Sequence, residues 1–223
     1  MNRSISRSSG DQTVQARVYS QLRQSILDGD FRPGRSVTIR GLADELNVSP
    51  MPVREALRRL TTERALEVSG TGRVSVPKMT PAKLQELVRA RICLEKQAAI
   101  DAMPFIGKTR LQRLTRFDRK INRMIARADH QGYVIAHRKF HFDLYSAGKG
   151  SVFMPLIESV WLQISPFLTS TLLHLDSYST SDRHIEILAA LENQDATALG
   201  FAVEADIRHG LGALTESDWQ KKA

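Results

Sequence analysis

Apolar residues recur at intervals of three and four along most of the chain, and this spacing predicts helices. In the first predicted helix, residues 14–28, Val14, Val18, Leu22 and Ile26 lie on one stripe. A glycine and a Pro-Gly pair follow and end this helix in a turn. The stripe indicates a helix with one face against a core.

Two short helices and a hairpin are predicted next. The helices cover residues 39–46 and 50–63, with Thr38 as the expected N-cap of the first and Pro50 at the first position of the second. Two short β runs around a Gly-bearing turn predict a hairpin over residues 66–76. The order helix, turn, helix, hairpin is that of a winged helix-turn-helix.

Helical periodicity then continues to the end of the chain. Its predicted helices cover residues 80–103, 109–130, 133–146, 152–164, 166–175, 182–191 and 195–214. We expect a mainly α fold with a winged helix-turn-helix and an all-helical bundle or barrel. The expected units are a flexible tail at 1–13, a DNA-binding domain at 14–78 and a helical domain at 79–223.

Composition narrows the class of protein. The 223 residues hold 32 Lys and Arg against 24 Asp and Glu, a net charge of +8, and a single cysteine, Cys93. With only 13 Gly and 8 Pro besides that one cysteine, the composition excludes collagen, low-complexity and disulfide-scaffold proteins. No apolar run is long enough for a membrane span, so we expect a cytoplasmic protein without membrane attachment. The basic balance is a weak indication of nucleic-acid binding.

The second short helix has the features of a recognition helix. Such a helix places its N-terminal residues at base edges in the major groove, and Arg54 is the first arginine on the exposed face. Arg73 in the hairpin suits the minor groove or the DNA backbone. The residues expected at DNA are Arg40, Ser49, Met51, Arg54, Arg58 and Arg73. The alternative is that these arginines form a solvated helix face.

The same segment resembles GntR-family regulators. The run from Leu42 to Leu60 is similar to the family signature LA-x-x-L-x-VS-x-x-PVREALRRL, and residues 18–29 resemble the opening of the family. Two positions depart from the pattern: Pro50-Met51 stands where the family has Arg-Thr, and the wing reads Thr71-Gly72-Arg73 where it has Asn-Arg-Gly. The departures imply a different operator sequence within the same fold.

The helical part resembles the FCD effector domain of the FadR-like branch. The matching pieces are residues 91–95, 140–145 and 184–195, and residues 155–161 are similar to the shorter, six-helix VanR-like form. The resemblance implies a ligand-responsive, sequence-specific transcriptional regulator rather than an enzyme. It further implies a homodimer on a palindromic operator, action as a repressor, and a small-molecule effector such as an organic acid.

Many FCD domains bind a divalent metal with one Asp and three His, and the corresponding positions here are His137, His141, His184 and Asp206. His137 and His141 are four residues apart and share a helix face. Three imidazoles and a carboxylate suit Zn²⁺, Ni²⁺, Mn²⁺ or Fe²⁺. The alternative is a polar effector pocket around His141 and His184 that holds no metal.

The helix predicted over residues 109–130 has a basic face. Its cations at steps of three or four are Arg110, Arg113, Arg116, Lys120, Arg123 and Arg127. This face either contacts DNA phosphate or an acidic partner, or is simply solvated.

Two rival functions are a metal-dependent enzyme that uses the His/Asp cluster, and a non-specific nucleic-acid-binding protein. The enzyme has little support, because no general base adjoins the cluster and HExxH is absent.

Overall fold

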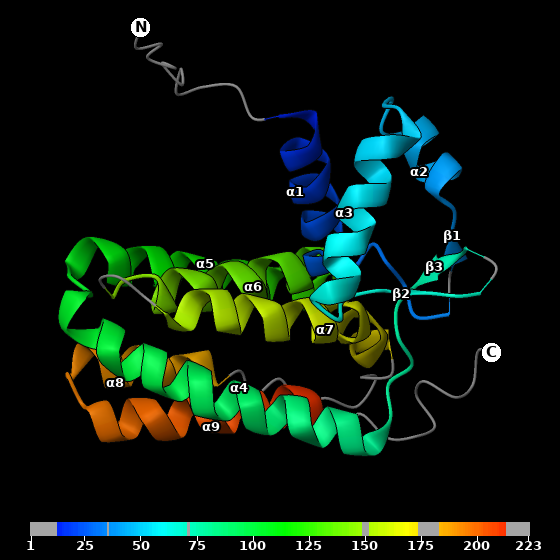
Figure 1. Ribbon diagram of the computed structural model, residues 1–223. Coiled ribbons are helices and arrows are strands. Elements are labelled where there is room, and N and C mark those ends of the chain that lie inside the picture. The colour runs from blue at the N-terminus through cyan, green and yellow to red at the C-terminus, as the bar shows by residue number, and fades with distance from the viewer. Residues whose placement is uncertain (1–12, 35, 71, 149–151, 174–182, 213–223) are drawn as a thin grey trace, which may run out of the picture.

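The computed structural model describes residues 13–34, 36–70, 72–148, 152–173 and 183–212 (Figure 1). A mainly α fold is confirmed, with a small helical and stranded part at one end of a larger helical part. The first part consists of α1 (Val14–Leu27), β1 (Ser36–Val37), α2 (Ile39–Glu45), α3 (Pro50–Thr62), β2 (Glu67–Val68) and β3 (Val74–Ser75). The predicted tail lies outside the described residues apart from Thr13.

Local sequence determines where these helices begin and end. The Thr38 hydroxyl accepts a hydrogen bond from the backbone N–H of Gly41, which confirms the expected N-cap of α2. Such a cap stabilises a helix by about 1 kcal/mol. Asn47 follows α2 with a φ of +52°, a left-handed conformation that asparagine tolerates better than most residues. The sequence therefore encodes the sharp turn between α2 and α3.

The sheet has three strands in the order β1-β3-β2, all antiparallel. Val74 of β3 pairs with Val37 on one side and Val68 on the other. The hairpin of β2 and β3 matches the prediction, although Thr71 in its turn lies outside the described residues. β1 was not predicted, because two residues carry no periodic pattern and their partner strand comes 37 residues later.

The second part is built from long helices. Its elements are α4 (Pro81–Ala102), a 3₁₀ turn (Met103–Phe105), α5 (Lys108–Ala126), α6 (His130–Tyr145), α7 (Phe153–Leu173), α8 (His184–Glu192) and α9 (Ala196–Gly212). In Figure 1, α5, α6 and α7 lie nearest the N-terminal part, and α4, α8 and α9 lie on the far side. The arrangement encloses a common interior, into which all six α-helices direct buried residues.

Helix α7 corrects one prediction. The sequence predicted separate helices on either side of Pro166, but the structure has one helix that continues through it. Proline removes one backbone hydrogen bond and usually breaks a helix. Here Trp161, Ile164 and Phe167 are all buried, so packing on both sides of the proline favours a continuous helix. The predicted end at residue 175 lies outside the described residues.

The two parts of the chain are in direct contact. Helix α1 packs against α3 through Val18, Leu22 and Ile26 and also lies against α7. Arg23 of α1 forms an ion pair of 2.7 Å with Glu158 of α7. Helix α1 therefore packs against elements of both parts. No helix within the described part of the chain is long and apolar enough to cross a membrane.

Candidate metal centre and nucleic-acid interface

The recognition helix α3 has a buried face and an exposed face. Its buried positions are Pro52, Val53, Ala56, Leu57 and Leu60. On the opposite face Met51 is 60% exposed, and Arg54 and Arg58 are also exposed. This division matches the expected one. The exposed face of the N-terminal half of α3 is therefore accessible to double-stranded DNA.

Three of the predicted DNA residues make few contacts within the protein. Within the described part of the chain, Arg40 and Arg54 form no ion pair, and the Ser49 hydroxyl makes no capping hydrogen bond although Ser49 occupies the N-cap of α3. Arg58 pairs with Glu55 at 3.3 Å, and Arg73 Nη1 donates to Ser36 Oγ at 3.4 Å. Arg54 is therefore the cation of α3 most available to a base edge.

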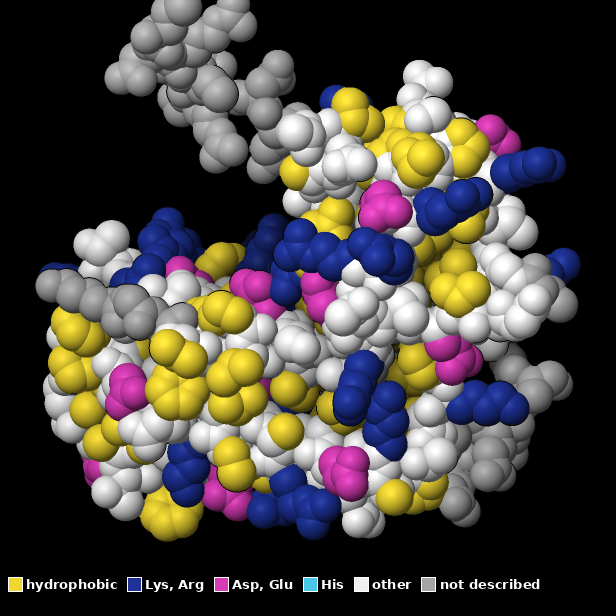
Figure 2. Space-filling view, in the orientation of Figure 1, with side chains coloured by type: hydrophobic (Ala, Val, Ile, Leu, Met, Phe, Trp, Pro, Cys, Tyr) yellow, Lys and Arg dark blue, Asp and Glu magenta, His cyan; other side chains and the backbone are white. Residues whose placement is uncertain are grey.

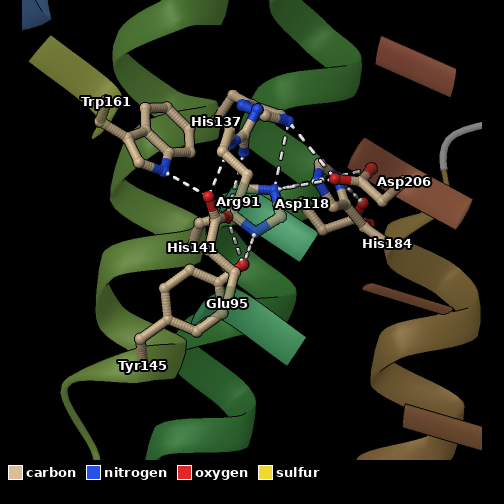
Figure 3. Close-up of polar contacts among 9 residues, drawn as sticks. All are labelled: Arg91, Glu95, Asp118, His137, His141, Tyr145, Trp161, His184 and Asp206. Carbon is tan, nitrogen blue, oxygen red and sulfur yellow. Dashed lines mark hydrogen bonds and ion pairs between the residues drawn. The ribbon is translucent and has the colours of Figure 1, made fainter. Parts of the chain in front are cut away.

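The three histidines and the aspartate of the predicted metal set converge in the helical interior (Figure 3). His137 and His141 come from α6, His184 from the start of α8, and Asp206 from α9. One donor atom of each lies within 4.8 Å of all the others. The fold thus brings together His141 and His184, which are 43 positions apart in the sequence, and Asp206, which follows 22 positions after His184.

The geometry of this cluster fits a divalent ion. His141 Nε2 lies 3.2 Å from His137 Nε2, 3.3 Å from His184 Nε2 and 3.2 Å from Asp206 Oδ2. Ligand atoms about 2.1 Å from one ion and 90–110° apart are separated by about 3.0–3.4 Å. The three spacings around His141 Nε2 therefore match those of ligands on Zn²⁺ or a similar ion, and the donor set is suitable, while His137 Nε2 and His184 Nε2 lie farther from the Asp206 oxygens, at 3.9 and 3.7 Å.

Electrostatics also favours a cation at this point. Burial, followed by the neighbouring His141, lowers the pKa of His137 well below that of a free imidazole. Burial alone would raise the pKa of Asp206, but His184 and His141 outweigh it and hold that pKa far below its usual value. The cluster thus keeps a carboxylate and a neutral imidazole available, which are the protonation states that ligate metals.

A buried polar network beside the cluster was not predicted from the sequence. Arg91 and Glu95 of α4 are 2% and 0% exposed and form a bidentate ion pair of 2.6 and 3.0 Å. Trp161 and Tyr145 donate to the same carboxylate. The Arg91 guanidinium also lies 4.4 Å from the centre of the Trp161 ring. In sequence an Arg and a Glu four residues apart resemble an exposed helix pair, so no local signal marks them as interior.

Outer contacts distinguish the three imidazoles. The Nδ1 of His141 lies 3.0 Å from the Tyr145 hydroxyl, and the Nδ1 of His184 lies 3.8 Å from Asp118 Oδ1. The Nδ1 of His137 is buried with no hydrogen-bond partner in the part of the chain that the structure describes. Burial, followed by the charge of Glu95, raises the pKa of Tyr145 well above 10. Of the three histidines, His141 therefore has the most firmly held ring, because its Nδ1 contacts the Tyr145 hydroxyl.

Helix α6 connects the cluster to the N-terminal part. Arg138 directly follows His137 in sequence and reaches Asp28, the C-cap residue of α1, at 2.6 Å. Both side chains of this ion pair are largely buried. Gln131, also on α6, donates to Asp30 at 2.6 Å. A displacement of α6 at the cluster would thus act directly on the residues at the C-terminal end of α1.

The structure divides the basic helix α5 into two groups of cations. Arg110 and Arg113 both reach Asp143, and Arg113 does so with two short hydrogen bonds. Six others are exposed and form no ion pair within the described residues: Lys108, Arg116, Arg119, Lys120, Arg123 and Arg127. At 100° per residue these six, here termed the α5 stripe, span an arc of about 120°. Figure 2 shows basic side chains along this edge of the helical part.

Neutralising the α5 stripe tests whether it contacts DNA phosphate. If it does, the triple variant Arg116→Gln, Arg119→Gln, Arg123→Gln should flatten the slope of log K against log salt by about 0.9 per lost phosphate contact. The measurement is fluorescence anisotropy with a 40-bp duplex. A matched variant removes Lys83, Arg89 and Arg208 from α4 and α9. Equal slopes for wild type and the stripe variant would identify the stripe as a solvated face.

Comparison with known proteins places both parts of the chain. Residues 14–76 match the family described as "Bacterial regulatory proteins, gntR family", and residues 86–209 match the FCD domain. The chain is 28% identical over 182 residues to the HTH-type transcriptional regulator McbR of Escherichia coli K12, covering 80% of this chain and 82% of that protein. It is 24% identical to the gluconate operon transcriptional repressor of Bacillus subtilis over 80% of this chain and 72% of that protein.

Solved structures show the same fold. The structure of E. coli McbR/YncC superposes with a TM-score of 0.83 at 23% identity, covering 91% of this chain and 97% of that one. A GntR-type putative transcriptional regulator from Rhodococcus sp. RHA1 superposes with a TM-score of 0.72 at 25% identity, covering 92% of this chain and all of that one. The arrangement of the two parts is therefore shared with known transcriptional regulators.

Proposed function

Because this chain belongs to the GntR family of bacterial regulatory proteins and carries an FCD domain, we propose that it is a homodimeric, effector-controlled repressor. Family and relatives are transcriptional regulators, which favours this reading over an enzyme. The observation that carries the proposal is a single chain with an exposed recognition helix and an enclosed His/Asp cluster, linked by α6.

In this proposal residues 14–78 read DNA. Arg54 donates to guanine, while Arg40, Ser49, Met51, Arg58 and Arg73 contact neighbouring bases or phosphates. The exposure of Arg54 and the absence of an ion pair to it within the described residues support its role. The pairs of Arg58 with Glu55 and of Arg73 with Ser36 are exposed and weak enough to exchange for phosphate.

Residues 79–223 sense the effector and form the dimer. One winged helix contacts too few base pairs for high specificity, so two subunits on a palindromic operator are needed. The name of the Bacillus gluconate operon repressor supports repression as the mode of control. Repression predicts that expression from a reporter behind the operator rises when this gene is deleted.

His137, His141, His184 and Asp206 would hold the metal. When bound, a divalent ion such as Zn²⁺, Ni²⁺, Mn²⁺ or Fe²⁺ supplies a positive charge and coordination positions for a carboxylate effector. The chain's own contribution is to enclose the site, to keep Asp206 ionised and to orient the imidazoles. A small organic acid is the effector class that this chemistry favours.

In vitro selection of duplexes by the full-length chain tests the DNA-binding proposal. We expect a palindromic consensus that binds at least about 10³-fold more tightly than a mixed-sequence duplex. Light scattering should give about twice the 25.0 kDa mass of the chain. Equal affinity for selected and mixed DNA would instead identify a non-specific nucleic-acid-binding protein.

The Arg138–Asp28 ion pair is expected to couple the cluster to the DNA-binding part. Coupling free energies between sites are typically 1–3 kcal/mol, a 5- to 150-fold change in affinity. With Zn²⁺ as the probe, Arg138→Gln and Asp28→Asn should each reduce the change that Zn²⁺ causes in operator affinity, and should leave Zn²⁺ affinity itself similar. Operator Kd with and without Zn²⁺ measures this effect.

The exposed pair of Arg208 and Glu204 on α9 provides the control, because Arg208→Gln also removes an ion pair but lies away from α1. That variant should respond to Zn²⁺ as wild type does. A full Zn²⁺ response in both Arg138→Gln and Asp28→Asn would show that the signal takes another route.

A further inference from the structure

The Glu95 carboxylate is surrounded by four donors, and this arrangement determines the direction of the adjacent hydrogen bonds. Its Oε1 accepts from Arg91 Nε at 2.6 Å and from Trp161 Nε1 at 3.0 Å. Its Oε2 accepts from Arg91 Nη2 at 3.0 Å and from the Tyr145 hydroxyl at 2.9 Å. Guanidinium and indole N–H groups can only donate. Because the Tyr145 hydroxyl donates in the fourth contact, Glu95 accepts in all four.

Tyr145 has one hydroxyl proton, and the contact with Glu95 uses it. If the proton pointed elsewhere, the hydroxyl oxygen and Glu95 Oε2 would meet lone pair to lone pair at 2.9 Å inside the protein. The hydroxyl oxygen must then act as an acceptor in its second contact, which is with His141 Nδ1 at 3.0 Å. That contact is a hydrogen bond only if Nδ1 of His141 carries a proton.

We propose that Tyr145 and Glu95 are positioning residues that hold His141 with a proton on Nδ1, so that Nε2 is the ring nitrogen left to face His137, His184 and Asp206. This inference rests on the proposed metal site but concerns a state of the protein that exists without metal. A tautomer protonated on Nε2 alone would lose the hydrogen bond to Tyr145 and keep its only proton on the nitrogen that a metal must take, 3.2 Å from Asp206 Oδ2. Residues that hydrogen-bond to the non-ligating ring nitrogen of a metal-bound histidine typically change metal affinity by 10- to 100-fold.

The direction of donation is consistent from one end of this chain of contacts to the other. Arg91 holds Glu95, Glu95 takes the proton of Tyr145, and Tyr145 accepts from His141. Figure 3 shows these residues on one side of the cluster, with His184 and Asp206 on the other. Arg91 and Glu95 of α4 thereby affect the protonation of His141, although neither residue is among the proposed metal ligands.

The first experiment reads the tautomer directly in metal-free, full-length protein. Side-chain ¹⁵N NMR of histidine distinguishes a protonated from an unprotonated Nδ1. We expect His141 to show a protonated Nδ1 in wild type. In Tyr145→Phe, which removes the acceptor, the population of His141 protonated on Nδ1 should fall. A wild-type His141 with an unprotonated Nδ1 would overturn the proposal, whatever the protein's affinity for metal.

The second experiment is a titration with Zn²⁺ alone, followed by calorimetry. Tyr145→Phe should weaken binding by about 10- to 100-fold relative to wild type. Tyr19→Phe is the matched control, since it also removes a tyrosine hydroxyl bonded to a glutamate, Glu63, but lies in the DNA-binding part. It should leave Zn²⁺ affinity unchanged. Thermal melts of both variants check that each remains folded.

The outcomes separate the two proposals. If wild type does not bind Zn²⁺, the metal proposal fails, and the NMR result alone decides the role of Tyr145. If wild type binds Zn²⁺ and Tyr145→Phe binds it equally well, the positioning role is wrong although the metal site stands. A comparable loss in Tyr19→Phe would also overturn the positioning role, because the effect would then be one of general stability.

Discussion

Replacing Arg54 by alanine is expected to abolish operator binding and leave the dimer folded. A bidentate arginine–guanine contact contributes about 1–3 kcal/mol of discrimination, and a dimer loses it twice, about 30-fold to 10⁴-fold in affinity. The side chain is exposed and forms no ion pair within the described residues, so the free energy of unfolding should change by less than about 0.5 kcal/mol. A mobility-shift assay on the selected operator measures the effect.

Two further variants make this result specific to base reading. Arg54→Lys keeps the charge but lacks the planar fork, so it should retain non-specific affinity and still lose preference for the operator. Arg89→Ala removes an exposed arginine from α4 and should bind normally. Wild-type affinity in Arg54→Ala would show that the assignment of the recognition residue is wrong.

Replacing Glu95 by leucine is expected to destabilise the helical part strongly. It leaves the guanidinium of Arg91 buried without its counter-charge and removes the acceptor of Trp161 and Tyr145. Removing one partner of a buried ion pair costs about 3–5 kcal/mol. In a chain of this length that corresponds to a fall in Tm of about 2–4 °C per kcal/mol. Urea unfolding followed by circular dichroism measures the free energy.

A double variant tests the cause of this loss. Arg91→Met combined with Glu95→Leu removes both charges and should recover much of the stability, because a hydrophobic pair of similar volume often equals a buried ion pair. Neutralising Arg208, whose exposed side chain pairs with Glu204, serves as the comparison, with an expected cost of at most about 1 kcal/mol. A loss below about 1 kcal/mol in Glu95→Leu would contradict the structural role of the pair.

The N-terminal part was predictable because its information is local. The cap at Thr38 and the apolar positions of α3 act over three to five residues, and each has the conformation that its sequence predicted. The left-handed turn at Asn47 is equally local. The strand β1 is the exception. Its two residues pair with a strand far along the chain, and such pairing depends on the fold as a whole.

The helical part was predictable in type and less so in detail. Periodicity predicted a helix break at Pro166, whereas burial of the residues around it maintains one continuous α7. Resemblance to the six-helix form of the FCD domain agrees with the helices of the described residues, α4 to α9. The four cluster residues were identified by family spacing, and only the fold brings their donor atoms within 4.8 Å.

By itself, the sequence determined the winged helix, its exposed arginines and the helical class of the remainder, since these depend on neighbouring residues and on periodic burial. The tertiary structure alone decided that Arg91 and Glu95 are interior, that Arg113 is bound by Asp143, and that Arg138 reaches Asp28. The physical reason is that burial and pairing of a charge are set by the elements that pack around it. Charged residues with the same spacing can lie in solvent or in the core, and only packing distinguishes the two.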